Sequence, residues 1–248
     1  MKALKTSFLT MSLIIAGTMT SVSLNAQTTW NIGTPNATAL TATLDASGTL
    51  TINGTGDMQD FVYKPSDGIN TIPWYSVRST ITALAINSGV TRIGDCAFYQ
   101  CGNIANALAL PSTLTAIGDQ AFFNCQKMTG TINIPNVVTI GSYAFDHCLK
   151  LTGALTLPNS LTNLGDYAFN SCIALNGALT IPSSITIINN RVFQACSGFN
   201  GALTIPSSVT SIGTDAFNKC TGLTGTLTLP NALTVIGGNA FNGCLYLY

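Results

Sequence analysis

Apolar side chains recur along this chain in a pattern that repeats about every 24 residues. A representative unit, residues 151–174, reads LTGALTLPNSLTNLGDYAFNSCIA. Leucine alternates with threonine at 155–157, which predicts a short strand, and Pro158 ends it because proline cannot donate to a strand ladder. A second alternating piece, 161–164, predicts another strand that reaches a glycine. We expect the AFxxC stretch that follows to form one short helical or 3₁₀ turn with its Ala and Phe facing inward.

The residue after that glycine is usually small and polar. Asp, Ser, Asn and Thr are preferred at a helix N-cap, where a side-chain oxygen accepts a free backbone N–H. We therefore expect these residues to cap the short turn. They are Asp95, Asp119, Ser142, Asp166, Asn190 and Thr214, with Gly238 in the last unit.

Phenylalanine and cysteine keep the same phase through the whole repeat region. Successive phenylalanines lie 24 residues apart with one step of 23, and a cysteine always follows three residues later. Such phase locking is the signature of a repeat architecture, and it predicts two internal columns of stacked side chains. The columns are Phe98, Phe122, Phe145, Phe169, Phe193, Phe217 and Phe241, and Cys101, Cys125, Cys148, Cys172, Cys196, Cys220 and Cys244.

One unit alone cannot fold, because its apolar side chains contribute about 1.5–3 kcal/mol each, whereas ordering the backbone costs on the order of 1–2 kcal/mol per residue. Stability must come from stacked neighbours. The sequence therefore predicts a repeat solenoid over residues 81–248, a right-handed parallel β coil of seven units that resembles leucine-rich repeats.

The segment 27–80 departs from the repeat. Alternating residues at 40–44 and 50–52 flank Asp45-Ala46-Ser47-Gly48, which predicts a β-hairpin. Two aromatics, Trp74 and Tyr75, come just before the first coil. Terminal coils need a cap over the open core, so we interpret this segment as a small β-rich N-terminal cap.

The first 26 residues have the layout of a secretory signal peptide: Lys2 and Lys5, an apolar run, and a small-residue end. Residues 27–248 then hold seven Lys and Arg against nine Asp, a net charge of −2. This charge balance predicts no positively charged surface for nucleic acid. No membrane span is predicted in the mature chain. We expect a secreted or cell-surface protein.

The phrase LTIPSSVTSIGTDAF, residues 203–217, and its relatives in the other units resemble the BspA-like leucine-rich repeats of bacterial cell-surface proteins. The lead-in GTLTINGTG at 48–56, followed by IPWY at 72–75, also resembles the segment that often precedes such repeats. The resemblance covers about residues 30–248. It implies a secreted or surface-attached protein, often an adhesin for host extracellular proteins or other microbes.

Candidate chemistry along the chain is sparse. His147, the single histidine, occupies a position held elsewhere by unrelated residues, which indicates an exposed slot. The in-phase cysteines are interpreted as small buried hydrophobic residues rather than disulfides or a metal ladder, because one thiol per coil does not build a tetrahedral zinc site. Cys96 lies off the column and is predicted to be the thiol that solvent reaches. No enzyme, cofactor or metal site is expected.

The preferred functional hypothesis is an adhesin-like binding protein that presents a hydroxyl-rich strand face to an extracellular protein ligand, such as a host matrix or microbial surface protein. The alternative is a structural or carbohydrate-contacting surface component. The ligand-facing strand positions would be Ala109, Asn133, Thr156, Thr180, Thr204 and Thr228.

The chain stops at residues 244–248, inside the closing turn of the seventh unit. We expect this C-terminal end of the solenoid to be uncapped, with Leu245 and Leu247 left for a following coil to bury. An uncovered core layer pairs readily with other chains. The sequence therefore predicts either a fragment of a longer protein or a partner at this end, self-association included.

Overall fold

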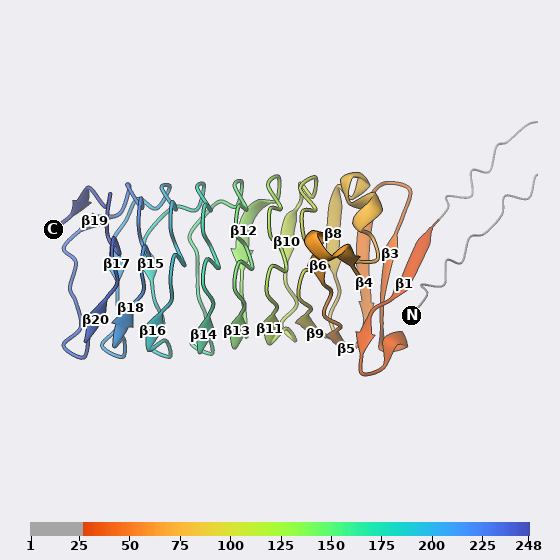
Figure 1. Ribbon diagram of the computed structural model, residues 1–248, viewed down its shortest axis with the longest axis horizontal. Coiled ribbons are helices and arrows are strands. Elements are labelled where there is room, and N and C mark those ends of the chain that lie inside the picture. The colour runs from red at the N-terminus through yellow and green to blue at the C-terminus, as the bar shows by residue number, and fades with distance from the viewer. Residues whose placement is uncertain (1–26) are drawn as a thin grey trace, which may run out of the picture.

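Each unit of the repeat forms one coil, and successive coils stack along the long axis of the molecule (Figure 1). This computed structural model describes residues 27–248, so the predicted signal peptide lies outside the described residues. The coils build a parallel β-solenoid with a spacing of about 24 residues, as the sequence predicts.

The N-terminal end of the stack is a four-stranded sheet in the order β1-β3-β4-β8. The predicted hairpin is present, because β3 pairs with β4 in antiparallel fashion across the turn at 45–48. Strand β4 then pairs in parallel with β8, the first strand of the repeat region. The bounds are β1 Thr28–Asn31, β3 Leu40–Leu44, β4 Thr49–Gly54 and β8 Ala83–Ile86, with the 3₁₀ helix η1 at Ala37–Ala39.

The second short strands of the first four coils continue a longer sheet that begins in the N-terminal segment, with strand order β14-β13-β11-β9-β5-β2. From β9 to β14 the pairing is parallel and advances one repeat per strand, for example Ile117 against Ile140 and Ile140 against Leu164. Strand β2 pairs with β5 in antiparallel fashion. The bounds are β2 Gly33–Thr34, β5 Gly56–Met58, β9 Val90–Ile93, β11 Ala116–Ile117, β13 Thr139–Ile140 and β14 Asn163–Leu164.

The remaining strands form short separate sheets. Strands β16 Ile187–Ile188, β18 Ser211–Ile212 and β20 Val235–Ile236 form a three-stranded sheet. The first strands of four coils pair two by two: β10 Ala107–Ala109 with β12 Thr129–Asn133, and β15 Leu179–Thr180 with β17 Leu203–Thr204. Strand β19 Thr224–Gly225, which lies just before the first-strand position of its coil, pairs with β21 Tyr246–Leu247.

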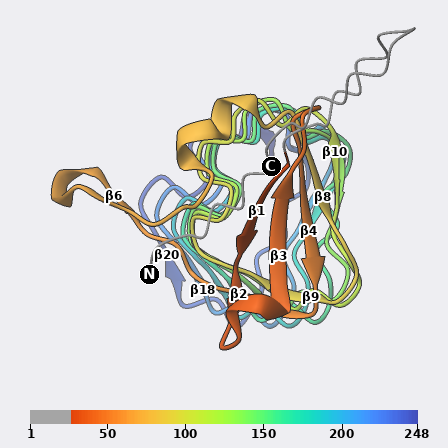
Figure 2. The same ribbon diagram turned by 90° about the vertical axis from the view of Figure 1, so that its right-hand side faces the viewer.

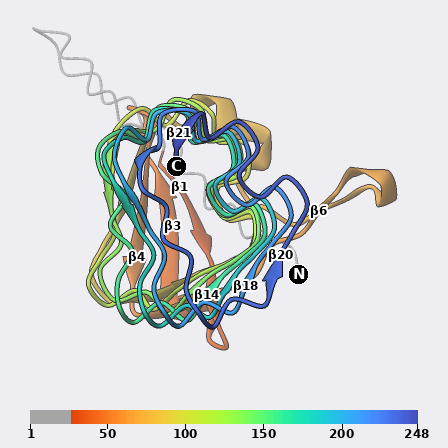
Figure 3. The ribbon, with the colours of Figure 1, turned by 90° about the vertical axis from the view of Figure 1, so that its left-hand side faces the viewer.

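One hairpin projects from the side of the solenoid (Figures 2 and 3). It consists of β6 Tyr63–Lys64, the 3₁₀ helix η2 Pro65–Asp67 and β7 Ile69–Asn70. It leaves the side opposite β8 and β10, where the outline of the coils bends inward (Figure 2). The 3₁₀ helix η3, Tyr75–Thr80, follows it at one edge of that side.

The AFxxC stretches form single turns with the i to i+3 bonds of a 3₁₀ turn, such as Cys101 N–H to the Phe98 carbonyl. Two residues in each of these turns have positive φ, for example Tyr143 at 58° and His147 at 59°. This left-handed geometry costs about 1–3 kcal/mol for a residue other than glycine. It is stabilised by bonds between coils, since the N–H groups of these residues donate to the next coil.

The residues predicted to cap these turns act between coils instead, which corrects the expectation of a local N-cap. Asp95 Oδ1 accepts the backbone N–H of Asp119 at 3.0 Å, and Asp119 Oδ1 accepts that of Ser142 at 2.7 Å. Asp166 and Asn190 continue the pattern into the later coils. The side chain therefore satisfies an N–H of the following coil, because the turn presents that group along the stack rather than back to itself.

The phenylalanine and cysteine columns lie inside the coils. The first six members of each column are buried, whereas Phe241 and Cys244 in the last coil are partly exposed. Neighbouring phenylalanine rings stack with centroids 5.0–5.9 Å apart. Trp74 extends the column beyond Phe98 at 5.9 Å, and its Nε1–H donates to the Ala97 carbonyl at 2.9 Å.

All eight cysteines of the described chain are free thiols. From Cys125 onward, each column Sγ donates to the phenylalanine carbonyl of the preceding coil at 3.0–3.2 Å. Burial raises the pKa of these thiols, that of Cys101 to about 12. The column therefore packs as small apolar groups with one weak donor each.

The prediction that solvent reaches Cys96 is wrong. Its exposed fraction is 8%, and burial raises the pKa of its thiol. The projecting hairpin contributes to this burial, because the Tyr63 backbone lies within hydrogen-bonding reach of the Cys96 thiol. The thiol itself donates to Gln120 Oε1 at 3.7 Å. The least buried thiol is Cys244 in the last coil.

The sheets are interrupted between the fourth and fifth units. In the described chain, no backbone hydrogen bond joins 162–164 to 186–188, and none joins 154–157 to 178–182. The fifth unit has Asn189 where the other units have glycine, contrary to the expectation of a glycine in every unit. A Cβ at such a glycine meets the preceding coil, 2.4 Å from Ser142 N in the case of Gly165.

Asn189 therefore holds its strand away from the neighbouring coil. Its Nδ2 fills the gap by donating to the Leu164 carbonyl at 2.7 Å. The phenylalanine column is also widest at this boundary, 5.9 Å between Phe169 and Phe193. The turns of the two units stay bonded, for example through Phe169 N–H to the Val192 carbonyl.

The C-terminal coil leaves some apolar side chains exposed. Val235 is 53% exposed and Leu245 is 72% exposed. Strand β21 nevertheless pairs with β19, and Leu227 N–H donates to the Tyr248 carbonyl at 2.9 Å. Leu247, unlike Leu245, is partly buried against the core.

Candidate binding faces

The predicted ligand-facing positions all have exposed side chains, on the face formed by the first strands of the coils. We call these positions the strand face. Four of them lie on β10, β12, β15 and β17, Thr156 makes an isolated bridge to Asn133, and Thr228 lies outside any strand. Ala109, Asn133, Thr156, Thr180, Thr204 and Thr228 bring hydroxyl, amide and methyl groups, with no aromatic ring or charge among them.

Thr156 and Thr180 also line a shallow depression of about 250 Å³. It lies where the strands of the fourth and fifth units separate, and Pro182 closes one side. The interruption of the sheet is thus visible on this face as a hollow. The depression contains no titratable side chain.

The opposite side of the molecule is more varied. We call it the turn face: it comprises residues 94–101 and the equivalent turns of the later coils, with the projecting hairpin beside them (Figure 2). Ala97, Phe98 and Cys101 point into the core, whereas Tyr99 and Gln100 are partly exposed. The side chains at the outward positions therefore determine the surface chemistry of the turn face.

Six partly exposed aromatic rings follow one another along the turn face. We call this row the aromatic stripe. It consists of Tyr75, Tyr63, Tyr99, Phe123, Tyr143 and Tyr167.

Close ring pairs join the stripe: Tyr99 with Phe123 and Tyr143 with Tyr167 are stacked, whereas Tyr63 and Tyr99 are tilted by 34°. Ring centroids lie 4.7 Å apart for Tyr63 and Tyr99, 4.9 Å for Tyr99 and Phe123, and 4.4 Å for Tyr143 and Tyr167. Phe123 and Tyr143 meet at 6.5 Å with their planes 63° apart, so the two stacks join edge to face. In the two stacked pairs each ring covers one face of its partner, so these rings present mainly their edges and hydroxyl groups outward.

Three tyrosine hydroxyls of the stripe stay protonated well beyond neutral pH. Burial, with a hydrogen bond to Tyr63 adding to it, raises the pKa of Tyr75 to about 12. Burial also raises the pKa of Tyr99 and Tyr143. These three hydroxyls therefore act as neutral donors and acceptors.

A polar cluster continues the row beyond Tyr167. The Arg191 guanidinium lies 5.2 Å from the Tyr167 ring centroid and its Nε donates to Asp215 Oδ2 at 3.0 Å. Asp215 in turn accepts from Asn218 Nδ2 at 2.8 Å, and that hydrogen bond, with the Arg191 contact, lowers the pKa of Asp215. The far end of the stripe thus has a fixed ion pair.

His147 is exposed, as the sequence predicts, and Asp146 Oδ1 lies 2.7 Å from its Nδ1. Burial raises the pKa of Asp146, although Asn170 donates to it at 2.7 Å. Within residues 27–248, no group of three or more His, Cys, Asp or Glu side chains is placed to hold a metal ion.

Sequence inspection missed the stripe because its members change position within the repeat. Tyr99 and Phe123 follow the column phenylalanine, whereas Tyr143 and Tyr167 precede it by two residues. The available signal was the excess of Tyr and Phe outside the column, which an alignment of the repeats places at two separate positions.

The family described as the BspA type leucine rich repeat region matches this chain in six copies, over residues 71–200 and 201–248. The chain belongs to this BspA-type leucine-rich repeat family. Membership supports a cell-surface or binding role in general, and solenoids of this family are typically not enzymes. Of the described residues, none forms a helix long and apolar enough to cross a membrane.

Solved structures share the fold. A leucine rich cell surface protein of Faecalibacterium prausnitzii A2-165 is 29% identical, with a TM-score of 0.59 over 85% of this chain and 52% of that one. A leucine-rich repeat protein of Bacteroides ovatus is 23% identical, with a TM-score of 0.60 over 80% and 54%. The leucine rich repeat protein of T. pallidum is 22% identical, with a TM-score of 0.50 over 86% and 90%.

This chain therefore spans about half the length of the first two structures. None of the curated proteins compared with it matches.

Proposed function

We propose that this protein is an extracellular, adhesin-like binding protein whose protein ligand lies along the aromatic stripe of the turn face. One observation carries the proposal: the stripe is a continuous row of partly exposed aromatic rings that runs along four coils and the projecting hairpin. Tyrosine and arginine are the residues enriched at the centres of protein interfaces.

The stripe is also suited to binding because it is already ordered. Stacked rings and left-handed backbone hold Tyr143 and Tyr167 in place before any ligand arrives. Side chains that are immobile in the free protein lose less entropy on association. Arg191 at the end of the row adds a fixed polar contact.

The chemistry of the stripe favours protein over carbohydrate. Sugar rings pack on open aromatic faces, and here one face of each ring in the two stacked pairs is covered by its partner, at 4.9 Å for Tyr99 and Phe123 and 4.4 Å for Tyr143 and Tyr167. Ring edges and hydroxyls suit the mixed apolar and polar surface of a protein. The strand face, whose predicted positions carry hydroxyl, amide and methyl groups, is the surface used for comparison.

The test is a pull-down with purified residues 27–248 against immobilised extracellular matrix proteins, alongside a glycan array. The test variant is Tyr143→Asn with Tyr167→Asn, a change that the fold accommodates because Asn239 holds the equivalent left-handed position. The matched control is Thr156→Asn with Thr180→Asn, since Asn133 holds the equivalent place on the strand face. The proposal is supported if the native chain captures a matrix protein, the tyrosine variant no longer captures it, and the threonine variant still does.

Capture lost with the control variant instead would assign the ligand to the strand face. Binding to glycans with no matrix protein retained would contradict the choice of a protein ligand.

A further inference from the structure

A polar depression of about 350 Å³ lies on the edge of the turn face beside η3. We call it the basic rim. Its lining is Arg78, Ser79, Gln100, Gly102, Asn103, Gln126 and Lys127. Two of these side chains are cationic and none is a carboxylate, although the described chain as a whole has more Asp than Lys and Arg.

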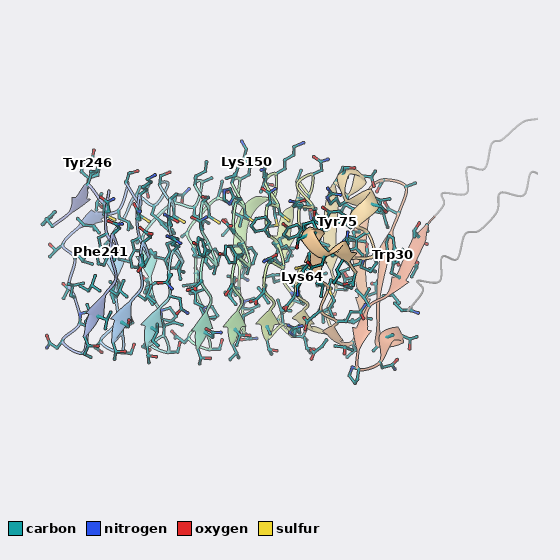
Figure 4. All side chains as sticks on the ribbon, viewed as in Figure 1. Trp30, Lys64, Tyr75, Lys150, Phe241 and Tyr246 are labelled. Atoms are coloured by element: carbon teal, nitrogen blue, oxygen red, sulfur yellow. The ribbon has the colours of Figure 1, made fainter. Side chains whose placement is uncertain are left out.

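The two cations are not used for ion pairing. In residues 27–248, Arg92 and Arg191 pair with carboxylates, whereas Arg78 and Lys127 do not. Lys150, which Figure 4 shows on the same edge, repeats the position of Lys127 in the next coil. The rim is thus a local excess of positive charge without an internal counterion.

Arg78 is nevertheless held in place. Its guanidinium carbon lies 3.8 Å from the Tyr75 ring centroid, and its Nη1 donates to the Tyr75 carbonyl at 2.8 Å. Across the depression, Lys127 Nζ donates to Asn103 Oδ1 at 2.9 Å, and Asn103 Nδ2 donates to the Ser79 carbonyl at 2.7 Å. A guanidinium fixed by stacking keeps further N–H groups free for a planar oxyanion.

The rim adjoins the stripe directly. Tyr75 belongs to the stripe and its hydroxyl donates to Gln100 Oε1 at 3.3 Å, a side chain that lines the rim. A ligand lying on the stripe therefore reaches Arg78 at this end of the row. The apolar row and the cations form one continuous surface.

We infer that the basic rim is a carboxylate subsite, which receives an acidic side chain of the protein ligand that lies on the stripe. This inference rests on the proposed function, which holds that the ligand is a protein. The rim adds the chemistry of that partner: a segment with Asp or Glu beside apolar residues. Attraction between the rim and an acidic partner also makes association faster at low salt.

The rim can be tested without the natural ligand. The probe is a tetraglutamate peptide with blocked ends, titrated into residues 27–248 at low salt and followed by NMR of the backbone amides of 100–103. Arg78→Gln should weaken binding of the peptide about 10-fold, because a hydrogen bond to a charged group is lost. Arg78→Lys keeps the charge and should retain more of the binding.

Lys219→Gln removes a cation elsewhere on the turn face and is the control; it should leave peptide binding unchanged. The Tyr143→Asn and Tyr167→Asn variant should also leave it unchanged, which separates failure of the rim from failure of the stripe. A tetraglutamate peptide that does not bind, or binds Arg78→Gln as well as the native chain, would overturn the inference.

A parallel titration uses a sialylated trisaccharide. If that sugar binds in an Arg78-dependent manner and the peptide does not, the rim is a site for an acidic glycan, and the assignment to a protein carboxylate is wrong.

Discussion

Gly141→Ala should separate the second and third coils in the way that Asn189 separates the fourth and fifth. A Cβ at Gly141 would lie 2.4 Å from Asp119 Oδ1, 2.5 Å from Asp119 N and 2.6 Å from Gly118 C. Two of these atoms belong to backbone, which cannot turn aside as a flexible side chain does. The strand must therefore move away from its neighbour.

The cost follows from the bonds at that point. Gly141 N–H donates to the Ile117 carbonyl at 2.8 Å, Val138 N–H to the Thr115 carbonyl at 2.7 Å, and Ser142 N–H to Asp119 Oδ1 at 2.7 Å. Each hydrogen bond contributes about 0.5–1.5 kcal/mol net. After the gain of about 0.4–1 kcal/mol from a less flexible unfolded chain, the free energy of unfolding should fall by about 1–4 kcal/mol.

Urea denaturation followed by circular dichroism measures this change, and hydrogen exchange should show lost protection at 138–142. The matched control is Gly238→Ala in the last coil, where a Cβ would meet nothing within 4 Å. That variant should be neutral or stabilised by up to about 1 kcal/mol. Equal stabilities of the two variants would refute the close-approach argument.

Three further predictions concern other parts of the chain. Asn189→Gly should allow the interrupted sheet to close, so that amides at 186–188 gain protection from hydrogen exchange; unchanged exchange would exclude Asn189 as the cause. Cys244 should react first with a thiol reagent under native conditions, ahead of Cys96, since Cys96 is the more buried; peptide mapping that finds Cys96 modified first would contradict the structure. Burial raises the pKa of Asp146 above 3.8, so ionising it costs more in the folded chain than in the unfolded one. The free energy of unfolding should therefore contain a component that falls as pH rises from about 4 through the raised pKa, and Asp146→Asn should lack it. Urea melts between about pH 3.5 and about pH 7 check this, and parallel profiles for the two proteins would count against it.

The repeat, its period and its inward columns could be predicted from the sequence. Phe145 and Cys148 recur in phase with the leucines, and a phase-locked ladder leaves few folds that bury every member. The hairpin with its turn at 45–48 was equally predictable, because its turn residues stand between two runs of alternating apolar and polar residues. These features depend on local pattern, which a sequence displays directly.

The remaining features depend on contacts between coils. Tyr143 and Arg191 adopt a left-handed backbone that their own residue types disfavour, because hydrogen bonds to the next coil require it. The interruption at Asn189 depends on a Cβ meeting the preceding coil, which is visible once the coils are stacked. Cys96 is buried in part by a hairpin that the repeat does not contain.

The candidate site was the least predictable part. The strand face was chosen because alternation shows which residues point outward, and those six positions are indeed exposed. Their exposure is common to all coils and so does not distinguish a binding surface. The stripe becomes visible when Phe123 and Tyr143, from different positions of the repeat, meet in space.

The most direct test of the account is the dissociation constant of the captured matrix protein for three chains: the native protein, Tyr143→Asn with Tyr167→Asn, and Thr156→Asn with Thr180→Asn. Biolayer interferometry at one salt concentration gives all three. If the stripe is the ligand surface, its variant should bind about 30-fold more weakly, as loss of an interface hot spot of about 2 kcal/mol requires, and the strand-face variant should bind like the native chain. Native affinity in the stripe variant, with the loss confined to the strand-face variant, would contradict the account.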